Sequence, residues 1–442
     1  METYGCQMNI SDGELMEGVL EGEGYEIVSS AEEADVVLVN TCAIREHAER
    51  RVLGRVGQLS GLKRANPDLV IGVTGCMAQR LGDGLLEKAP HVDLVMGPDG
   101  YRALPQALAR LRPPSGNPRR LSVLDLTLDE NYQGLEQRRR STVGAWVPIQ
   151  RGCDHRCTFC IVPYVRGAEK NRDPEEVIHE IRGLADQGIT EVTLLGQTVN
   201  SYAYGDWSFP RLLQAVARVD GIRRVRYTSP HPNDVTLELV EVMAREEAVC
   251  EHVHLPVQSG NDRTLKRMVR RYTVGSFMEK VEMIRRAIPD VALSTDIIVA
   301  FPGETESEFQ DTLDLVREVR FDEAFTYKYS RREGTPATRL PPDQFIPDSE
   351  GQNRLERLIE VTRGIQAEIN RAEVGTVVEL LLERTGKHDG TVLGRTRRSK
   401  AVVVPGEASD AGSYVSALLT STTGATFVAE RLEAGKPLAG VS

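Results

Sequence analysis

The sequence lacks any run of apolar residues long enough to cross a membrane, which requires about 18 residues in a helix. It also lacks an export signal at its start, where Met1 is followed by Glu2, Thr3 and Tyr4 rather than by basic residues and an apolar stretch. No internal repeat or low-complexity tract is visible. These absences exclude a membrane-spanning or exported protein, and we expect a cytoplasmic protein that has no membrane partner.

Positive charge is not in excess, because 54 Lys and Arg residues stand against 65 Asp and Glu residues, giving a net charge of −11 at pH 7. Any contact with nucleic acid must therefore come from local basic clusters. The charged fraction of 27% and the hydrophobic fraction of 40% are typical of a folded chain. At 442 residues the chain exceeds the size at which one hydrophobic core stops growing, so we expect several domains.

Cysteine is scarce and odd in number. The seven cysteines are Cys6, Cys42, Cys76, Cys153, Cys157, Cys160 and Cys250. In a chain without an export signal, this count argues against a disulfide framework and favours metal or reactive sulfur chemistry. Cys250 has no spacing partner and precedes a predicted strand, so we expect a plain buried thiol there.

Apolar runs alternating with amphipathic segments predict an α/β protein of three domains. In residues 1–112, buried runs at 36–39, 69–73 and 92–95 predict a parallel-sheet α/β domain. Ser11 and Glu14 have the spacing of a capping box and predict a helix from there to about Gly22. Residues 113–141 are rich in proline and arginine and predict a linker.

The rest of the chain divides at about residue 372. In residues 142–372, strands expected to begin near 146, 191, 223, 252, 291 and 324 alternate with helices, which is typical of an open, partial (β/α)6 barrel. A helix after Pro342, apolar on one face, is expected to pack against that barrel. Five short apolar segments separated by glycine turns in residues 373–442 predict a small β-barrel.

Six of the cysteines form two triplets. Cys153, Cys157 and Cys160 follow the first predicted barrel strand, and three thiolates at this spacing can bind three irons of a 4Fe–4S cluster. The fourth iron is then open to a small molecule; a zinc site or a structural thiol cluster is the alternative. The other three cysteines each follow a predicted strand of the first domain. Parallel strands bring such positions to one edge of a sheet, although three ordinary buried cysteines would fit the spacing too.

The triplet Cys153, Cys157 and Cys160, second along the chain, has Phe159 before its last cysteine and resembles the signature of the radical S-adenosylmethionine enzymes. Residues 151–153 and 161–167 resemble the methylthiotransferase branch of that family, and the resemblance covers nearly the whole chain. It implies a radical S-adenosylmethionine barrel and two 4Fe–4S clusters, with all six cysteines as metal ligands and catalytic residues. It also implies that one open iron binds S-adenosylmethionine, whose reductive cleavage gives a 5′-deoxyadenosyl radical, and that the other holds the sulfur to be transferred.

Motifs at later strand ends resemble the S-adenosylmethionine site of the family. The implied cofactor contacts are Phe159, Gln197, Asn200, Gln258, Arg271 and Asp296. Phe159 would pack near the adenine, and Gln197 stands where many relatives have a carboxylate. Ordinary structural roles are the alternative: a turn cap for Asp296, backbone hydrogen bonds for Gln258 and a solvated helix face for Arg271.

Motifs of the first domain distinguish the substrate branches. Residues 3–9, 40–49 and 92–98 most resemble the branch that acts on N6-isopentenyladenosine next to the tRNA anticodon, which implies insertion of sulfur and a methyl group at C2. The ribosomal-protein branch has Pro-Lys after its first cysteine, and the threonylcarbamoyladenosine branch has Lys-Val after its second. These two substrates are the alternatives, and a non-enzymatic iron–sulfur RNA-binding protein is the alternative from another class.

The last domain resembles the TRAM domain, a small RNA-binding module. Three basic clusters could follow phosphates, although a charged cluster is usually a solvated face: Arg263, Lys266, Arg267, Arg270 and Arg271; Arg223, Arg224 and Arg226; Arg395, Arg397, Arg398 and Lys400. The resemblance implies tRNA as substrate, an electron donor such as a flavodoxin or ferredoxin, and a sulfur donor. We expect a monomer.

Overall fold

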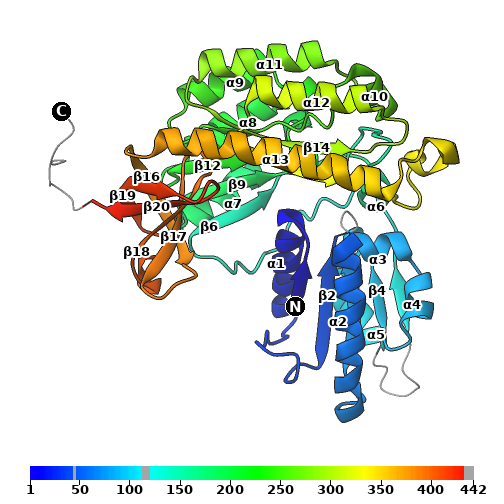
Figure 1. The fold of residues 1–442 in the computed structure, drawn as a ribbon. Coiled ribbons are helices and arrows are strands. Elements are labelled where there is room, and N and C mark those ends of the chain that lie inside the picture. Colours follow the sequence, from blue (N-terminus) through cyan, green and yellow to red (C-terminus); the bar gives the residue numbers. More distant parts are fainter. Residues whose placement is uncertain (43–45, 112–119, 433–442) are drawn as a thin grey trace.

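The structure is a computed structural model that describes residues 1–42, 46–111 and 120–432. Motif residues 43–45, the start of the predicted linker (112–119) and the end of the predicted last domain (433–442) lie outside the described residues. The first domain and the small C-terminal barrel lie at different ends of a central barrel (Figure 1). Among the described helices, none combines the length and the apolar character that a membrane span requires.

The first domain is a parallel sheet with helices on both faces. Its strands lie in the order β1 (Glu2–Tyr4), β2 (Val36–Thr41), β3 (Val70–Gly75), β4 (Leu94–Met96) and β5 (Leu121–Val123). Helices α2 (Glu46–Ala65), α3 (Cys76–Leu81) and α4 (Gly84–Lys88) pack on one face, and α1 (Gln7–Gly22) and α5 (Leu104–Leu111) pack on the other. The three predicted runs are confirmed as β2, β3 and β4. Strand β5 lies within the segment 113–141 predicted as a linker and pairs in parallel with β4, so this part of the segment extends the first sheet.

The predicted start of the first helix is wrong. Helix α1 begins at Gln7, and Cys6 occupies its N-cap position, where the Asn9 Oδ1 atom lies 3.4 Å from the Cys6 nitrogen. Ser11 and Glu14 lie inside the helix and are buried. They face the segment before the central barrel, since the Glu14 carboxylate accepts a hydrogen bond from Arg139 at 3.1 Å. The capping pattern therefore reflects a contact between domains, and the true helix start fixes Cys6 at the sheet edge.

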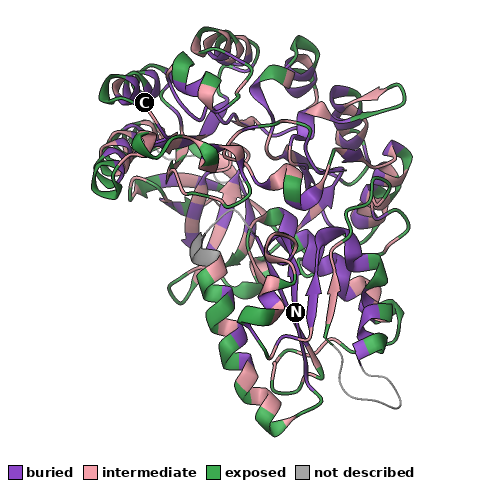
Figure 2. Cartoon of the chain, turned by 90° about the vertical axis from the view of Figure 1, so that its right-hand side faces the viewer, coloured by how far each residue is buried: buried purple, intermediate pink, exposed green. Residues whose placement is uncertain are grey.

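The central domain is the expected open six-stranded barrel. Strands β6 (Gly144–Pro148), β9 (Glu191–Leu195) and β12 (Arg224–Tyr227) form one parallel set, and β13 (His252–His254), β14 (Ala292–Val299) and β15 (Glu323–Lys328) form the other. A bridge between Val225 and Val249 joins the two sets. Apolar side chains from the barrel strands and the helices around them form one core, which is consistent with the buried strands in Figure 2. Those helices are α7 (Pro174–Asp186), α8 (Phe209–Ala217), α9 (Leu237–Arg245), α11 (Val274–Ala287), α12 (Glu306–Val319) and α13 (Asp348–Glu373).

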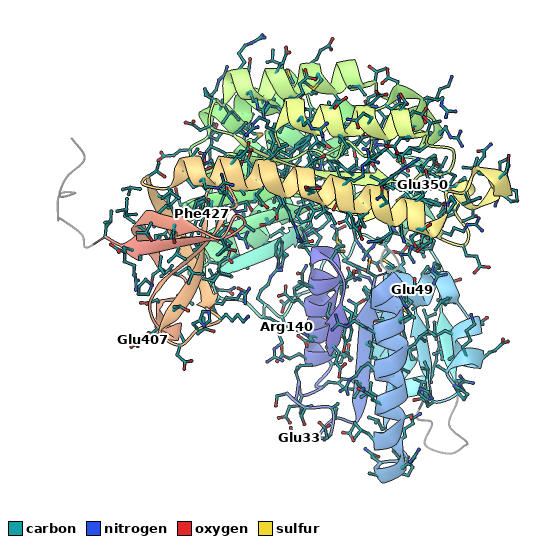
Figure 3. The ribbon with its side chains drawn as sticks, viewed as in Figure 1. Glu33, Glu49, Arg140, Glu350, Glu407 and Phe427 are labelled. Atoms are coloured by element: carbon teal, nitrogen blue, oxygen red, sulfur yellow. The ribbon has the colours of Figure 1, made fainter. Side chains whose placement is uncertain are left out.

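The five predicted strands of the last domain are confirmed. They form a closed barrel in the order β16 (Val377–Thr385), β17 (Thr391–Thr396), β18 (Ala401–Pro405), β20 (Phe427–Arg431) and β19 (Tyr414–Thr422). Phe427, labelled in Figure 3, is fully buried in the small core of this barrel. The predicted helix after Pro342 is α13, which packs on the central barrel through residues that include Leu358 and Ile365 and leads into β16.

Candidate active site where the first two domains meet

The second cysteine triplet lies in a tight loop between β7 (Gln150–Arg151) and the short helix α6 (Val162–Arg166). Gly152 allows the loop to fold back, because its φ is +76° and a Cβ atom there would lie 1.9 Å from the Ala168 carbonyl oxygen. Burial raises the pKa of the Cys160 thiol to about 12, and the neighbouring Cys157 adds to this rise. Metal binding at this site must therefore displace protons from the thiols.

Side chains from other barrel loops contact the same triplet. The Cys153 sulfur lies 3.2 Å from the Thr198 hydroxyl oxygen, and the half-buried Arg270 guanidinium donates to the Cys157 sulfur at 3.4 Å. His155, although inside the loop, stacks on His231 with 3.9 Å between ring centroids. This contact directs His155 to another loop and leaves the three thiols as the shared donor set.

The structure also brings the three cysteines of the first domain together. Cys6 caps α1, Cys42 follows β2, and Cys76 begins α3 directly after β3. A hydrogen bond with Cys42 lowers the pKa of Cys6 to about 6. Gly5 is in close contact with Cys42, since a Cβ atom on Gly5 would lie 2.9 Å from the Cys42 Cβ. The three thiols converge from separate strand ends and form a donor set that suits an iron–sulfur cluster with one open iron.

Buried charges join the two domains beside the cysteines. Arg166, at the end of α6, pairs with Asp12 of α1 at 2.6 Å, and its Nε donates to the Cys76 sulfur at 3.1 Å. Lys170 pairs with Asp99 at 2.7 Å, and Arg151 lies over the Tyr132 ring at 3.5 Å from its centroid. These charge-assisted contacts run from the radical domain to the first domain, so they position one cysteine triplet relative to the other.

The ends of the barrel strands form a polar, strained surface that fits S-adenosylmethionine. Ser229, Gln258 and Ala300 follow β12, β13 and β14, and each has a positive φ, between +56° and +68°. Such strain concentrates at ligand sites. The side-chain oxygens of Gln197 and Gln258 are buried without a hydrogen-bond partner among the described residues, so both are free to accept from an ammonium group.

The other candidate contacts are placed differently from one another. Asp296 faces the barrel interior, where its carboxylate lies 3.3 Å from His254 Nε2, and Phe159 packs against an apolar cluster that includes Met268 and Phe301. Asn200 braces two loops, since its amide donates to the His231 carbonyl at 2.9 Å and accepts from the His231 nitrogen at 2.7 Å. This use of both amide ends gives Asn200 a structural role, and its contact with the cofactor stays a prediction.

The side chain of Arg271 is exposed, whereas that of its neighbour Arg270 reaches Cys157. The contact of Arg271 with the cofactor stays a prediction, and the side chain that reaches the cysteine triplet is that of Arg270. Sequence reasoning missed Arg270 and Arg166 because a single sequence shows which residues are charged but not which way they point. Cys250 is buried between β12 and β13, as expected for a plain thiol.

Most of the predicted basic clusters serve contacts within the chain. Arg224 is fully buried and donates to the Arg395 carbonyl at 2.8 Å, and Arg226 donates to the Arg397 carbonyl at 2.8 Å. Arg397 pairs with Glu251, and Lys400 pairs with Asp322. These contacts dock the small barrel on the amino-terminal ends of the central strands, so the assignment of these side chains to phosphate binding is wrong.

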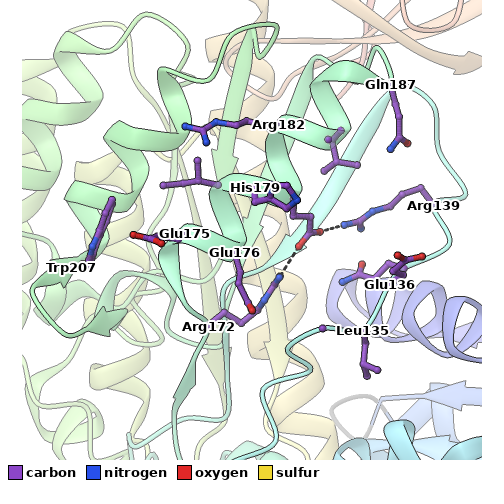
Figure 4. A pocket seen from close by; sticks show the side chains of 16 residues that line it. Leu135, Glu136, Arg139, Arg172, Glu175, Glu176, His179, Arg182, Gln187 and Trp207 are labelled. Atoms are coloured by element: carbon purple, nitrogen blue, oxygen red, sulfur yellow. Dashed lines mark hydrogen bonds and ion pairs between the residues drawn. The ribbon is translucent and has the colours of Figure 1, made fainter.

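A large groove lies away from the cysteines, between residues 134–139 and α7 (Figure 4). Arg139 and Arg172 cross it and both pair with Glu180, Arg172 at 2.8 Å. Because these charges already satisfy one another, the groove is a seam between the segment before the barrel and α7 rather than part of the site.

Three family models match the chain: the Radical SAM superfamily at residues 147–316, the uncharacterized protein family UPF0004 at 1–97 and the TRAM domain at 371–428. A tRNA-2-methylthio-N(6)-dimethylallyladenosine synthase of Carboxydothermus hydrogenoformans is 46% identical over 428 residues, which cover 95% of this chain and 95% of that protein. The chain belongs to this synthase family. A synthase of the same name from Moorella thermoacetica is 46% identical over 95% of this chain and 94% of its own.

Membership of the synthase family confirms the prediction of a radical S-adenosylmethionine methylthiotransferase that uses two 4Fe–4S clusters. Among solved structures, the radical S-adenosylmethionine methyltransferase TsrM from Kitasatospora setae, with cobalamin and a 4Fe–4S cluster bound, is similar with a TM-score of 0.55 and 16% identity. That match covers 74% of this chain and 70% of TsrM. The cobalamin-dependent radical enzyme OxsB matches with a TM-score of 0.52 at 12% identity, over 82% of this chain and 55% of its own. These likenesses concern the fold alone.

Proposed function

We propose that this synthase inserts sulfur and a methyl group at C2 of N6-isopentenyladenosine next to the anticodon of tRNA. The observation that carries the proposal is the pair of cysteine triplets on two domains, joined by one buried side chain. Arg166 leaves the main chain six residues after Cys160 and contacts Cys76 of the other triplet at 3.1 Å. Two clusters held this way suit a reaction that needs both a radical and a sulfur atom at one carbon.

The residues divide the work between the two triplets. When bound, the two clusters and S-adenosylmethionine supply three groups: a radical that removes hydrogen from C2, the sulfur atom that is inserted, and the methyl group that this sulfur carries. Cys153, Cys157 and Cys160 would hold the irons of the radical-forming cluster, and the unpaired amide oxygens of Gln197 and Gln258 would accept hydrogen bonds from the cofactor's ammonium group. Cys42, Cys76, Cys153 and Cys157 are buried, which limits the access of water to the reactive species.

The interior of the barrel provides a surface for the base. Phe325 and Tyr327 on β15 are 41% and 37% exposed, although they share the inward face of the strand. Ser294 lies on the side of β14 that faces away from the surrounding helices, and His254 forms a hydrogen bond with it. The rings of His254 and Phe325 are in edge contact, so Phe325 lies on the same inward side. Exposed aromatic rings inside an unfilled barrel suit stacking with a base that has been flipped out of its loop.

Strand β15 also leads to the loop that carries Cys153, Cys157 and Cys160. The segment after β15 returns to the cysteine loop, where the Ala337 amide donates to the Thr158 carbonyl at 2.9 Å. A base stacked on β15 would thus enter the barrel from the edge strand that leads to Cys157 and Cys160.

The further expectations rest on the sequence. We propose a cytoplasmic monomer that receives electrons from a flavodoxin or ferredoxin and sulfur from a separate donor. The domain divisions near residues 112, 141 and 372 and the individual cofactor contacts stay predictions.

The test is mass spectrometry of nucleosides from isopentenyladenosine-containing tRNA, incubated without oxygen with the reconstituted protein, S-adenosylmethionine and a reductant. We expect the 2-methylthio nucleoside. Formation of 5′-deoxyadenosine without that product would contradict the substrate and favour threonylcarbamoyladenosine or a ribosomal protein. The absence of both, with clusters confirmed, would favour a non-enzymatic RNA-binding protein.

A further inference from the structure

Arg166 belongs to the radical domain but makes its contacts in the first domain. It ends α6 with its side chain 3% exposed. Its Nε donates to the Cys76 sulfur at 3.1 Å, and its Nη2 pairs with Asp12 at 2.6 Å. Asp12 lies on α1, whose N-cap residue is Cys6, so the ion pair joins Cys76 to the helix that begins at Cys6.

The remaining nitrogen of Arg166 has no hydrogen-bond partner. Among the described residues, Nη1 is buried and unpaired, while the other two nitrogens are in use. A buried guanidinium with an unused donor is costly unless an acceptor arrives. The thiols beside it make a cluster sulfur or the sulfur to be transferred the fitting acceptor, and both carry negative charge.

We propose that Arg166 is the positioning residue of the sulfur-donating cluster. Its Nε–H fixes the Cys76 thiolate, and its Nη1–H donates to an anionic sulfur at the same site. This inference rests on the proposed function, because it requires a cluster on Cys6, Cys42 and Cys76. Hydrogen bonds and positive charge stabilise the more negative, reduced state of a cluster, so Arg166 raises its reduction potential.

The chain contains a matched control on the other triplet. Arg270 is half-buried and also donates to a cysteine sulfur, Cys157, at 3.4 Å. Arg270 further contacts the Tyr272 hydroxyl at 3.0 Å, within the radical domain. Each arginine thus contacts one triplet. Replacing one arginine at a time therefore tests each cluster while the other cluster serves as the control.

The experiment is a redox titration of reconstituted full-length protein followed by electron paramagnetic resonance, with iron and product measured on the same samples. We expect Arg166→Gln to lower the midpoint potential of the Cys6, Cys42 and Cys76 cluster and leave that of the other cluster in place. We expect Arg270→Gln to lower the midpoint potential of the Cys153, Cys157 and Cys160 cluster and to leave that of the Cys6, Cys42 and Cys76 cluster unchanged. The methylthio product of Arg166→Gln should fall about tenfold or more, the usual loss when a partner of a metal ligand is removed.

Asp12→Asn provides a second test that does not depend on removing the arginine. Neutralising Asp12 leaves the charge of Arg166 unbalanced, so the same potential should rise rather than fall. A purely structural role would not produce opposite shifts in the two variants.

The inference is overturned if Arg166→Gln leaves the potential of its cluster unchanged or shifts both clusters alike. It is equally overturned if Asp12→Asn and Arg166→Gln shift the potential in the same direction. A wild-type protein that holds about four irons instead of the eight of two such clusters would overturn the proposed function as well. Unmoved potentials in a protein with both clusters would count against this inference alone.

Discussion

Replacing Arg224 with Ala should loosen the small barrel from the central one. Arg224 is fully buried at the start of β12 and donates to the Arg395 carbonyl at 2.8 Å and to the Glu379 carboxylate at 2.9 Å. Removing one partner of a buried ion pair costs about 3–5 kcal/mol. Glu379 is partly exposed and keeps Arg223 at 2.9 Å, so we expect the lower end, about 3 kcal/mol. That is about a hundredfold increase in the undocked population.

Hydrogen exchange of the full-length protein measures this population. Amides of β12 and of the β16 and β17 strands should exchange faster in the variant, while those of the first domain should not change. Arg218→Ala is the matched control, because Arg218 pairs with Glu246 at 2.6 Å but is 64% exposed. Solvent screens an exposed pair of this kind, so this control should exchange like the wild type.

The salt dependence of tRNA binding separates docking from phosphate contact. An arginine that neutralises a phosphate adds about one to the slope of log affinity against log salt. Because Arg224 is satisfied within the chain, its replacement should leave the slope unchanged. A slope reduced by about one together with unchanged hydrogen exchange would refute the docking role and restore the phosphate role.

The other predictions concern the clusters and the base. Cys153→Ala should abolish 5′-deoxyadenosine formation, whereas Cys76→Ala should spare it and stop methylthiolation; chromatography of both products checks this, and methylthiolation by the second variant would contradict the two-cluster assignment. Phe325→Ala should raise the KM for tRNA about tenfold, because a stacked base contributes about 1–3 kcal/mol, while Tyr204→Ala, an exposed ring elsewhere, should not. Gly75→Ala should lose about half of the iron, since φ is +92° and the new Cβ atom would lie 2.4 Å from the Asn40 oxygen; iron analysis equal to wild type would contradict this.

Periodicity in the sequence predicted the elements that carry most of the core. The alternation of strands and helices predicted the starts of all six strands of the central barrel, and the glycine turns predicted the five strands of the small barrel. Strand β5 was missed because it lies within a proline- and arginine-rich segment that indicates a linker. The start of α1 was misplaced because Ser11 and Glu14 have the residue types of a cap but are used against the segment before the barrel. Local pattern cannot separate a cap from a contact made by the same side chain.

The cysteines of the site could be predicted because their spacing and their positions after strands are visible in the sequence. The roles of the arginines could not be predicted, because the partners of these side chains lie far away in the chain. Arg226 and Arg397 are 171 residues apart, and Arg166 and Cys76 are 90 apart. A guanidinium that meets a phosphate and one that meets a carboxylate or carbonyl of the next domain have the same sequence appearance.

The net charge of −11 gives this ambiguity a physical consequence. In a chain with more carboxylates than cations, an arginine at a domain boundary is more readily satisfied by a neighbouring domain than by an outside anion. At one end of the barrel, Arg224 of β12 pairs with Glu379 of the small barrel. At the other end, Arg166 pairs with Asp12 of the first domain. Domain docking thus uses the cations that a sequence would assign to RNA, and the same docking brings a cationic donor to Cys76. The charge that holds the two domains together is therefore also the charge that a sulfur-donating cluster would feel.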